Sequence, residues 1–130
     1  MNTETQSLRT IATPLVERFI QDQTEVLITN ISTEDGFVIC QRSSDQCNVE
    51  ADKMAATISA LTSMAEASAK SIKKGELEMV IIESNGANIL VKKTMIAGLD
   101  VILSIAINHK IAIGKAIYIT NRLSEELKLQ

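Results

Sequence analysis

Hydrophobic residues along this chain follow helical and strand-like spacings in turn. Near the N-terminus, apolar residues recur every three or four positions, as on one face of a helix: Leu8, Ile11, Leu15 and Phe19. Pro14 interrupts this pattern, because a proline inside a helix removes a hydrogen bond and costs about 3 kcal/mol. The sequence therefore predicts a helix that either starts near Thr13, with Pro14 in its first turn, or bends there.

A β-hairpin is predicted next. Residues 25–31 are rich in Val, Ile, Leu and Thr, and residues 37–41 form a second short apolar run. Asp35-Gly36 lies between them, and this dipeptide between two apolar runs is a strong hairpin signal. Polar residues 42–50 then predict a loop that leads to a second helix.

The second helix is expected to begin at Asp52, as its N-cap, and to run to Lys74. Gly75 is expected to end it in the left-handed conformation. One stripe at helical spacing predicts the face that packs on the sheet: Met54, Ile58, Leu61, Ala65, Ala69 and Ile72. A neighbouring stripe has only small side chains: Ala56, Ser59, Ala60, Ser63 and Ala67. These residues either serve only to form the helix or allow another backbone to approach closely.

Three strands and a third helix complete the pattern. Residues 77–84 and 87–94 flank Asn85-Gly86, which predicts a type I′ hairpin, and residues 99–107 form the last strand. Residues 111–127 have the apolar periodicity of a helix. The order α-β-β-α-β-β-β-α with short connections predicts a five-stranded antiparallel sheet.

Two strands are apolar on both faces, which decides how the layers are arranged. Side chains alternate across a strand, yet residues 79–82 and 101–107 are almost continuously apolar. A sheet of this kind must be covered on both sides, with one helix on one face and two on the other. We therefore expect a single α+β domain over residues 1–130, with its core at about 8–127, built as a three-layer α/β/α sandwich.

The third strand is expected at an edge of the sheet. It contains no proline, and the glutamates near it lie at one end only, so another chain could pair with it. Pairing with a second copy would extend the sheet across a two-fold axis and bring the two small-residue stripes together. The sequence thus predicts a homodimer. Its interface residues are expected to be Ala56, Ser59, Ser63, Ala67, Leu77, Glu78, Met79, Val80 and Ile81.

Composition narrows the class of partner. The net charge is −3 and aromatic residues make up 2% of the chain, so neither phosphate attraction nor base stacking favours nucleic-acid binding. No apolar run is long enough to span a membrane, and no secretory signal is evident, so we expect a cytoplasmic protein. Cys40 and Cys47 are expected to be idle thiols, because their spacing fits neither a redox pair nor a zinc site.

Catalytic signals are weak throughout. His109 is the only histidine and is expected to be an ordinary loop residue, and Asp100 has no partner carboxylate at a fixed spacing. The doublets Lys92-Lys93 and Lys73-Lys74 are expected to be solvated ends of elements. No phosphate-binding loop motif is present. We therefore expect no enzyme activity, no catalytic residue, no cofactor and no metal.

The order of elements, with Glu34-Asp35-Gly36-Phe37, the segment Gly-Glu-Leu-Glu-Met-Val-Ile-Ile-Glu at 75–83 and Asn85-Gly86, resembles the Roadblock/dynein light-chain family. The resemblance implies a profilin-like sandwich that dimerises through the third strand and the second helix. Members regulate or scaffold small Ras-like GTPases or serve as dynein cargo adaptors, and a prokaryotic relative stimulates GTP hydrolysis. It also implies that the partner sits on the helix pair, here residues 52–74. The expected contacts are Lys53, Thr57, Ala60, Glu66 and Lys70.

Three functions remain open at this point. The first is a homodimeric regulator that stimulates a small Ras-like GTPase. None of its arginines, Arg9, Arg18, Arg42 and Arg122, lies in a glycine-flanked loop that would project as an arginine finger, so stimulation would reposition the GTPase's own residues. The second is a scaffold or adaptor subunit with no effect on nucleotide turnover. The third is a small-molecule sensor with a pocket inside the sandwich.

Overall fold

A computed structural model describes residues 3–130 and contains the eight predicted elements in the predicted order. They are α1 (Thr3–Asp22), β1 (Val26–Ser32), β2 (Val38–Ser43), α2 (Ala51–Ser71), β3 (Val80–Ile82), β4 (Ala87–Ile96), β5 (Leu99–Asn108) and α3 (Ile113–Lys128).

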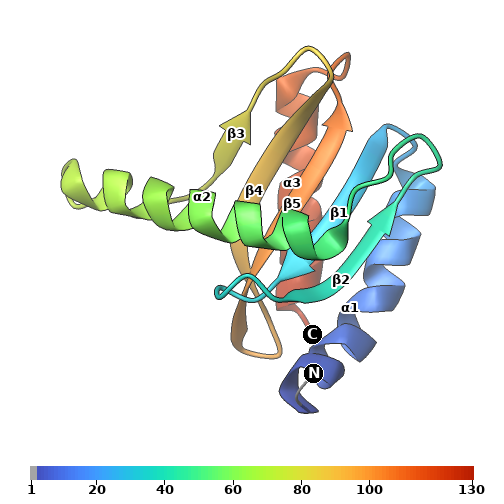
Figure 1. Ribbon diagram of the computed structural model, residues 1–130, viewed down its shortest axis with the longest axis horizontal. Helices are drawn as coiled ribbons and strands as arrows, with labels where there is room; N and C mark the ends of the chain where they lie inside the picture. Colours follow the sequence, from blue (N-terminus) through green and yellow to red (C-terminus); the bar gives the residue numbers. More distant parts are fainter. Residues whose placement is uncertain (1–2) are drawn as a thin grey trace.

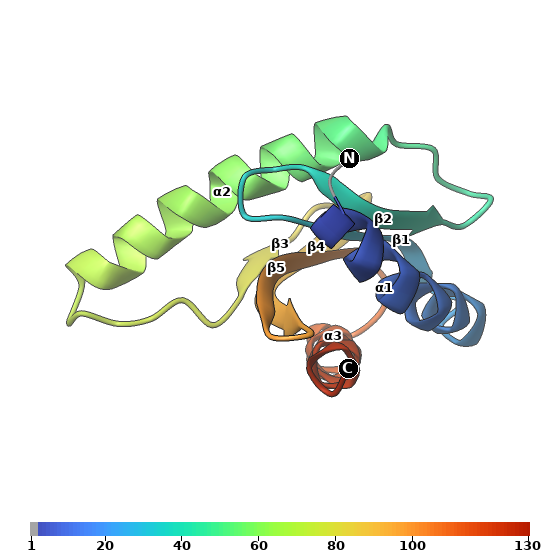
Figure 2. The same cartoon turned by 90° about the horizontal axis from the view of Figure 1, so that it is seen from below.

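The five strands form one antiparallel sheet in the order β2-β1-β5-β4-β3. Helices α1 and α3 cover one face of the sheet and α2 crosses the other (Figures 1 and 2). β3 forms an edge, as the sequence predicts. The predicted three-layer sandwich is confirmed.

Two apolar clusters, one on each face, hold the layers together. The larger cluster joins α1 and α3 to the sheet through fully buried residues such as Val16, Leu103 and Leu123. The smaller cluster lies under α2, where Met54 and Ile58 pack against the sheet. Every residue of β5 from Val101 to Ile107 is buried, because this strand is covered on both faces.

The structure decides between the two alternatives for the first helix. α1 continues through Pro14, so a start near Thr13 is wrong. Leu8, Ala12 and Val16 lie on one buried face of α1, on both sides of the proline. Tertiary packing of an amphipathic face supplies most of the stability of a helix in a protein, so it outweighs the loss of one hydrogen bond.

Both predicted ends of α2 need correction. Glu50, not Asp52, is the N-cap residue, because it has the extended backbone that precedes a helix (ψ 124°) and Asp52 already lies in the first turn. At the other end the left-handed residues are Lys73 (φ 54°) and Lys74 (φ 52°), not Gly75. The Gly75 N–H donates to the Ile72 carbonyl at 3.2 Å, which closes a turn of type I′ geometry around the two lysines.

The predicted third strand is too long and its turn is of another type. Only Val80–Ile82 pairs with β4, because residues 76–79 bring the chain back from the far end of α2 to the edge of the sheet (Figure 1). Among the described residues, neither Asn85 nor Gly86 has a positive φ, so the turn is not type I′. Instead, the backbone N–H groups of Gly86 and Ala87 donate to the Ser84 hydroxyl.

Candidate protein-interaction surface

Only the first half of α2 lies on the sheet, and its second half extends past β3 (Figures 1 and 2). Met54 and Ile58 are buried, whereas Leu61, Ala65 and Ala69 are only partly covered. Ile72, which we expected in the core, is the C-cap residue and is 70% exposed. The predicted core stripe is therefore right for two turns and wrong at its end, because the sheet stops before the helix does.

Part of the small-residue stripe contacts this chain's own β1–β2 turn. A Cβ atom at Gly36 would lie 3.3 Å from the Ser59 Cβ and 3.4 Å from the Ala56 Cα. The Ser59 hydroxyl donates to the Glu34 carbonyl at 2.6 Å. Small residues at these two positions let the turn approach α2. Further along the stripe, Ser63 and Ala67 are exposed.

The structure also identifies a second exposed stripe on α2 that sequence reasoning missed. Met64 is 63% exposed, and Leu61, Ser68 and Ile72 continue its line at spacings of three and four. At 3.6 residues per turn this stripe lies about half a turn around α2 from Ser59, which contacts the β1–β2 turn. β3 and the β1–β2 turn lie on opposite sides of α2 (Figure 1). The regular spacing of the stripe is visible in the sequence, but Leu61 and Ile72 also fit the periodicity of the predicted core face, and Met64 lies on neither predicted face.

The edge strand β3 lies beside this second stripe. Ile81 is 41% exposed, while Val80 is half-buried and packs with the cluster under α2. Met79 packs against the cluster on the opposite face. Leu77 and Glu78 lie in the connection that precedes the strand. The structure thus places the predicted strand residues along one edge, next to the part of α2 that leaves the sheet.

The residues predicted to contact a partner differ in exposure to solvent. Lys53, Thr57, Ala60 and Lys70 are exposed on α2. Glu66 is half-buried, and one of its carboxylate oxygens lies 3.2 Å from the Lys93 Nζ. Glu66 therefore has a role within the fold.

Lys93 links three elements of the α2 side. It extends from β4 to Glu66 on α2 and to Glu34 in the β1–β2 turn, 3.5 Å away. Burial of the ammonium lowers the pKa of Lys93, but the hydrogen bond to Glu66 and the negative charges of both glutamates outweigh this. The pKa of Lys93 therefore lies above its usual value of 10.5.

This arrangement corrects the expectation that Lys92 and Lys93 are solvated. Both lie within β4 and are half-buried, and the Lys92 Nζ donates to the Asn121 side chain at 2.8 Å. Adjacent residues of a strand point to opposite faces, so one lysine meets α3 and the other meets α2.

Lys93→Met should lower the free energy of unfolding at neutral pH by about 1 kcal/mol, because Glu66 would keep its half-buried charge without a cation. Since the folded-state pKa of Lys93 is raised, this contribution is complete below pH 10.5 and disappears as the pH rises through the folded-state pKa. Urea unfolding of both proteins across this range measures the difference. Lys110→Met, at an exposed position, is the control. An equal effect of both substitutions at neutral pH would contradict the assignment.

Side chains with catalytic potential are scattered. His109 is exposed, and its Nδ1 lies 3.2 Å from the Gly86 carbonyl oxygen, as expected for a turn residue. Cys40 is buried and Cys47 is half-buried, both as free thiols. Within residues 3–130 no group of three His, Cys, Asp or Glu side chains could hold a metal ion. No helix in this part of the chain is long and apolar enough to cross a membrane.

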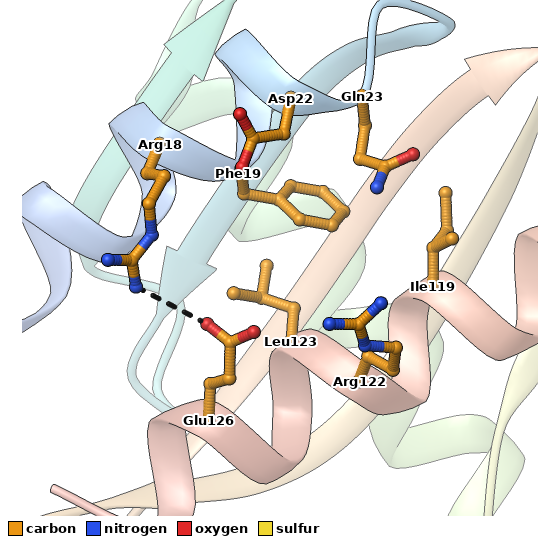
Figure 3. A pocket seen from close by; sticks show the side chains of 8 residues that line it. All are labelled: Arg18, Phe19, Asp22, Gln23, Ile119, Arg122, Leu123 and Glu126. Carbon is orange, nitrogen blue, oxygen red and sulfur yellow. Dashed lines mark ion pairs between the residues drawn. The ribbon is translucent and has the colours of Figure 1, made fainter.

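A small cleft of about 140 Å³ lies between α1 and α3 (Figure 3). Phe19, Ile119 and Leu123 supply its apolar lining. Arg18 pairs with Glu126 across it at 3.6 Å, and the Arg122 guanidinium lies 5.8 Å from the centre of the Tyr118 ring. The cleft marks where two helices of the same layer meet.

Comparison with known proteins identifies the family of this fold. The Roadblock/LC7 domain family matches residues 14–103. Comparison with curated protein sequences finds no match.

Several solved structures have the same fold. One is described as MglB with a tetrameric arrangement, at 15% identity and a TM-score of 0.77 over 93% of this chain and 88% of that chain. Gliding protein MglB from Thermus thermophilus is also 15% identical, with a TM-score of 0.75 over 98% and 91%. A Roadblock/LC7 domain from Streptomyces avermitilis is 19% identical, with a TM-score of 0.74 over 88% and 92%. The chain belongs to the Roadblock/LC7 domain family.

Proposed function

We propose that this chain is a non-enzymatic, cytoplasmic homodimer that regulates a small Ras-like GTPase. The observation that carries the proposal is the position of α2, whose second half leaves the sheet next to an unpaired edge strand. An apolar edge and an uncovered helix face favour association with another chain. Membership of the Roadblock/LC7 family supports the choice of a GTPase as partner.

In the proposed dimer, β3 of one copy pairs with β3 of the other, so that the two sheets become one. Ile81 lies at this junction, and Leu61 and Met64 of the two copies pack beside it. Of the residues predicted from the sequence, we assign Ser63, Ala67 and residues 77–81 to the same interface, whereas Ala56 and Ser59 contact the β1–β2 turn of their own chain. Self-association of this fold is consistent with the tetrameric arrangement described for the similar MglB structure.

The paired α2 helices would then present their outward face to the GTPase. The four arginines of this chain lie on α1, β2 and α3, away from this face. Arg9 donates to the Ile39 carbonyl, and Arg18 and Arg42 form ion pairs with Glu126 and Glu17. These positions support stimulation by repositioning of the GTPase's own residues rather than by an arginine finger.

Single-turnover GTP hydrolysis by a Ras-like GTPase from the same organism tests the proposal. We expect the wild-type protein to form a complex with the GTPase and to accelerate hydrolysis. Ala60→Arg on α2 should abolish both effects, whereas Ser7→Arg, at an exposed position of α1, should not. Alanine at each of the four arginines in turn should leave acceleration intact.

The alternatives predict other results. A stable complex with unchanged hydrolysis would favour the scaffold function. The absence of any complex would refute a GTPase partner. A bound small molecule in native mass spectrometry of the purified protein would favour the sensor.

A further inference from the structure

An open groove of about 810 Å³ is lined by residues of four segments. These segments lie at the end of the molecule where α1 begins (Figure 1). The start of α1, the β1–β2 turn, the first turn of α2 and the β4–β5 turn form the walls of the groove. Phe37, 67% exposed, and Leu99, 37% exposed, provide apolar surface there. The groove, named the acidic groove below, has five carboxylates and one cation: Glu4, Glu34, Asp35, Asp52, Asp100 and Arg9.

Most of this negative charge is not neutralised within the fold. Lys93 balances Glu34, and the Arg9 Nε donates to a backbone carbonyl rather than to a carboxylate. Within residues 3–130, Asp35, Asp52 and Asp100 form no ion pair. An apolar surface ringed by unpaired carboxylates favours a ligand that is both cationic and apolar.

The far end of α2 has this combination of properties. Residues 70–74, named the α2 tip below, comprise Lys70, Ser71, Ile72, Lys73 and Lys74. Ile72 is 70% exposed, and none of the three lysines forms an ion pair within the described part of the chain. The tip projects from the body of the molecule (Figures 1 and 2).

The backbone of the α2 tip is in an unfavourable conformation at two residues. Lys73 and Lys74 both have positive φ, which costs a residue other than glycine about 1 kcal/mol or more. A type I′ turn ordinarily has Asn-Gly at these two positions. Lysine at both places stabilises the turn less well than Asn-Gly would, which points to a use for the two side chains.

We propose that the α2 tip of one copy docks in the acidic groove of a second copy. Asp52 lies in the first turn of α2 and Lys70 in its last turn. A helix of 21 residues is about 31 Å long, so tip and groove of one copy are too far apart to meet. The contact therefore joins two different copies, and the arrangement proposed is head-to-tail, unlike the two-fold contact through β3.

Such a contact would join two-fold dimers into larger assemblies. Head-to-tail interfaces close into rings or continue into open chains. The contact uses a five-residue tip and depends on exposed charges, so it is small, weak and sensitive to salt. Assembly would therefore increase with protein concentration and fall as salt is added.

Light scattering and analytical ultracentrifugation test the proposal over a range of concentrations at about 0.05 M and about 0.5 M salt. We expect species larger than the dimer at low salt and dimer alone at high salt. The double substitution Lys73→Asn, Lys74→Gly should weaken assembly beyond the dimer at least tenfold while raising the melting temperature, because it removes the lysines and suits the turn. Lys110→Met with Lys115→Met, at exposed positions, changes the net charge equally and should leave assembly unchanged.

Charge exchange gives the decisive measurement. Lys73→Glu with Lys74→Glu, and separately Asp35→Lys with Asp100→Lys, should each abolish assembly beyond the dimer, and a mixture of the two variants should restore it. Failure of the mixture to assemble, or a wild-type protein that stays dimeric at every concentration, would overturn the head-to-tail contact. Dissociation of the tip variants to monomers would also overturn it, because the tip would then belong to the two-fold interface. The hydrolysis assay with the GTPase is independent of these outcomes.

Discussion

Ile81→Lys and Met64→Lys should each convert the proposed two-fold dimer into monomers. Ile81 lies on the exposed edge strand and Met64 on the uncovered side of α2. In a two-fold interface each substitution occurs twice, so two ammonium groups would be buried against each other without a counter-charge. We expect the dimer to weaken at least about a hundredfold, which corresponds to about 3 kcal/mol.

Sedimentation equilibrium at several concentrations measures this change. Tyr118→Lys is a matched control, because Tyr118 is 60% exposed on α3, on the opposite side of the sheet. Circular dichroism should show folded protein for all three variants, since neither Ile81 nor Met64 belongs to a buried cluster. Unchanged dimer mass for both interface variants would refute the β3–α2 interface. Val80→Lys is less suitable, because Val80 also packs under α2 of its own chain.

Leu103→Ala should destabilise the fold more than any of the surface substitutions. Leu103 is fully buried at the centre of β5 and belongs to the cluster that joins α1 and α3 to the sheet. Removal of a buried leucine side chain loses its transfer free energy and leaves a cavity, so we expect a loss of about 2–5 kcal/mol. The melting temperature should fall by roughly 7–18 °C at this chain length.

Thermal unfolding at one fixed protein concentration measures the loss, because association with a second copy also affects the midpoint. Leu129→Ala provides the control, since Leu129 is 84% exposed at the end of α3 and its truncation should change stability by less than about 0.5 kcal/mol. Equal melting temperatures for the two variants would contradict the placement of Leu103 in the core.

The two proposed contacts of this protein would use different residues of α2. The contact through β3 requires its apolar side near Met64, whereas the α2 tip requires the charges of Lys70, Lys73 and Lys74. A single helix can serve both because its second half is free of the sheet. We therefore expect substitutions at Met64 and at Lys74 to act separately, the first on dimer formation and the second on assembly of dimers.

Sequence patterns failed where a distant residue, the end of the sheet or a neighbouring side chain changed the surroundings of a residue. Lys93 looks like a surface lysine in the sequence, because nothing local shows that Glu34 and Glu66 will lie beside it. Ile72 matches the core periodicity of α2, but the width of the sheet leaves it exposed. Asn85-Gly86 has the composition of a type I′ turn, yet the Ser84 hydroxyl holds a different one.

The sequence by itself determined the order of the eight elements, the antiparallel sheet, the layer arrangement and the edge position of β3. These features follow from apolar periodicity and short connections, which are local properties of the chain. Only the tertiary structure decided how far α2 extends beyond the sheet, which of its sides remains uncovered, and which carboxylates gather in one groove. These depend on where separate elements end relative to one another in space, and no local pattern of residues encodes that.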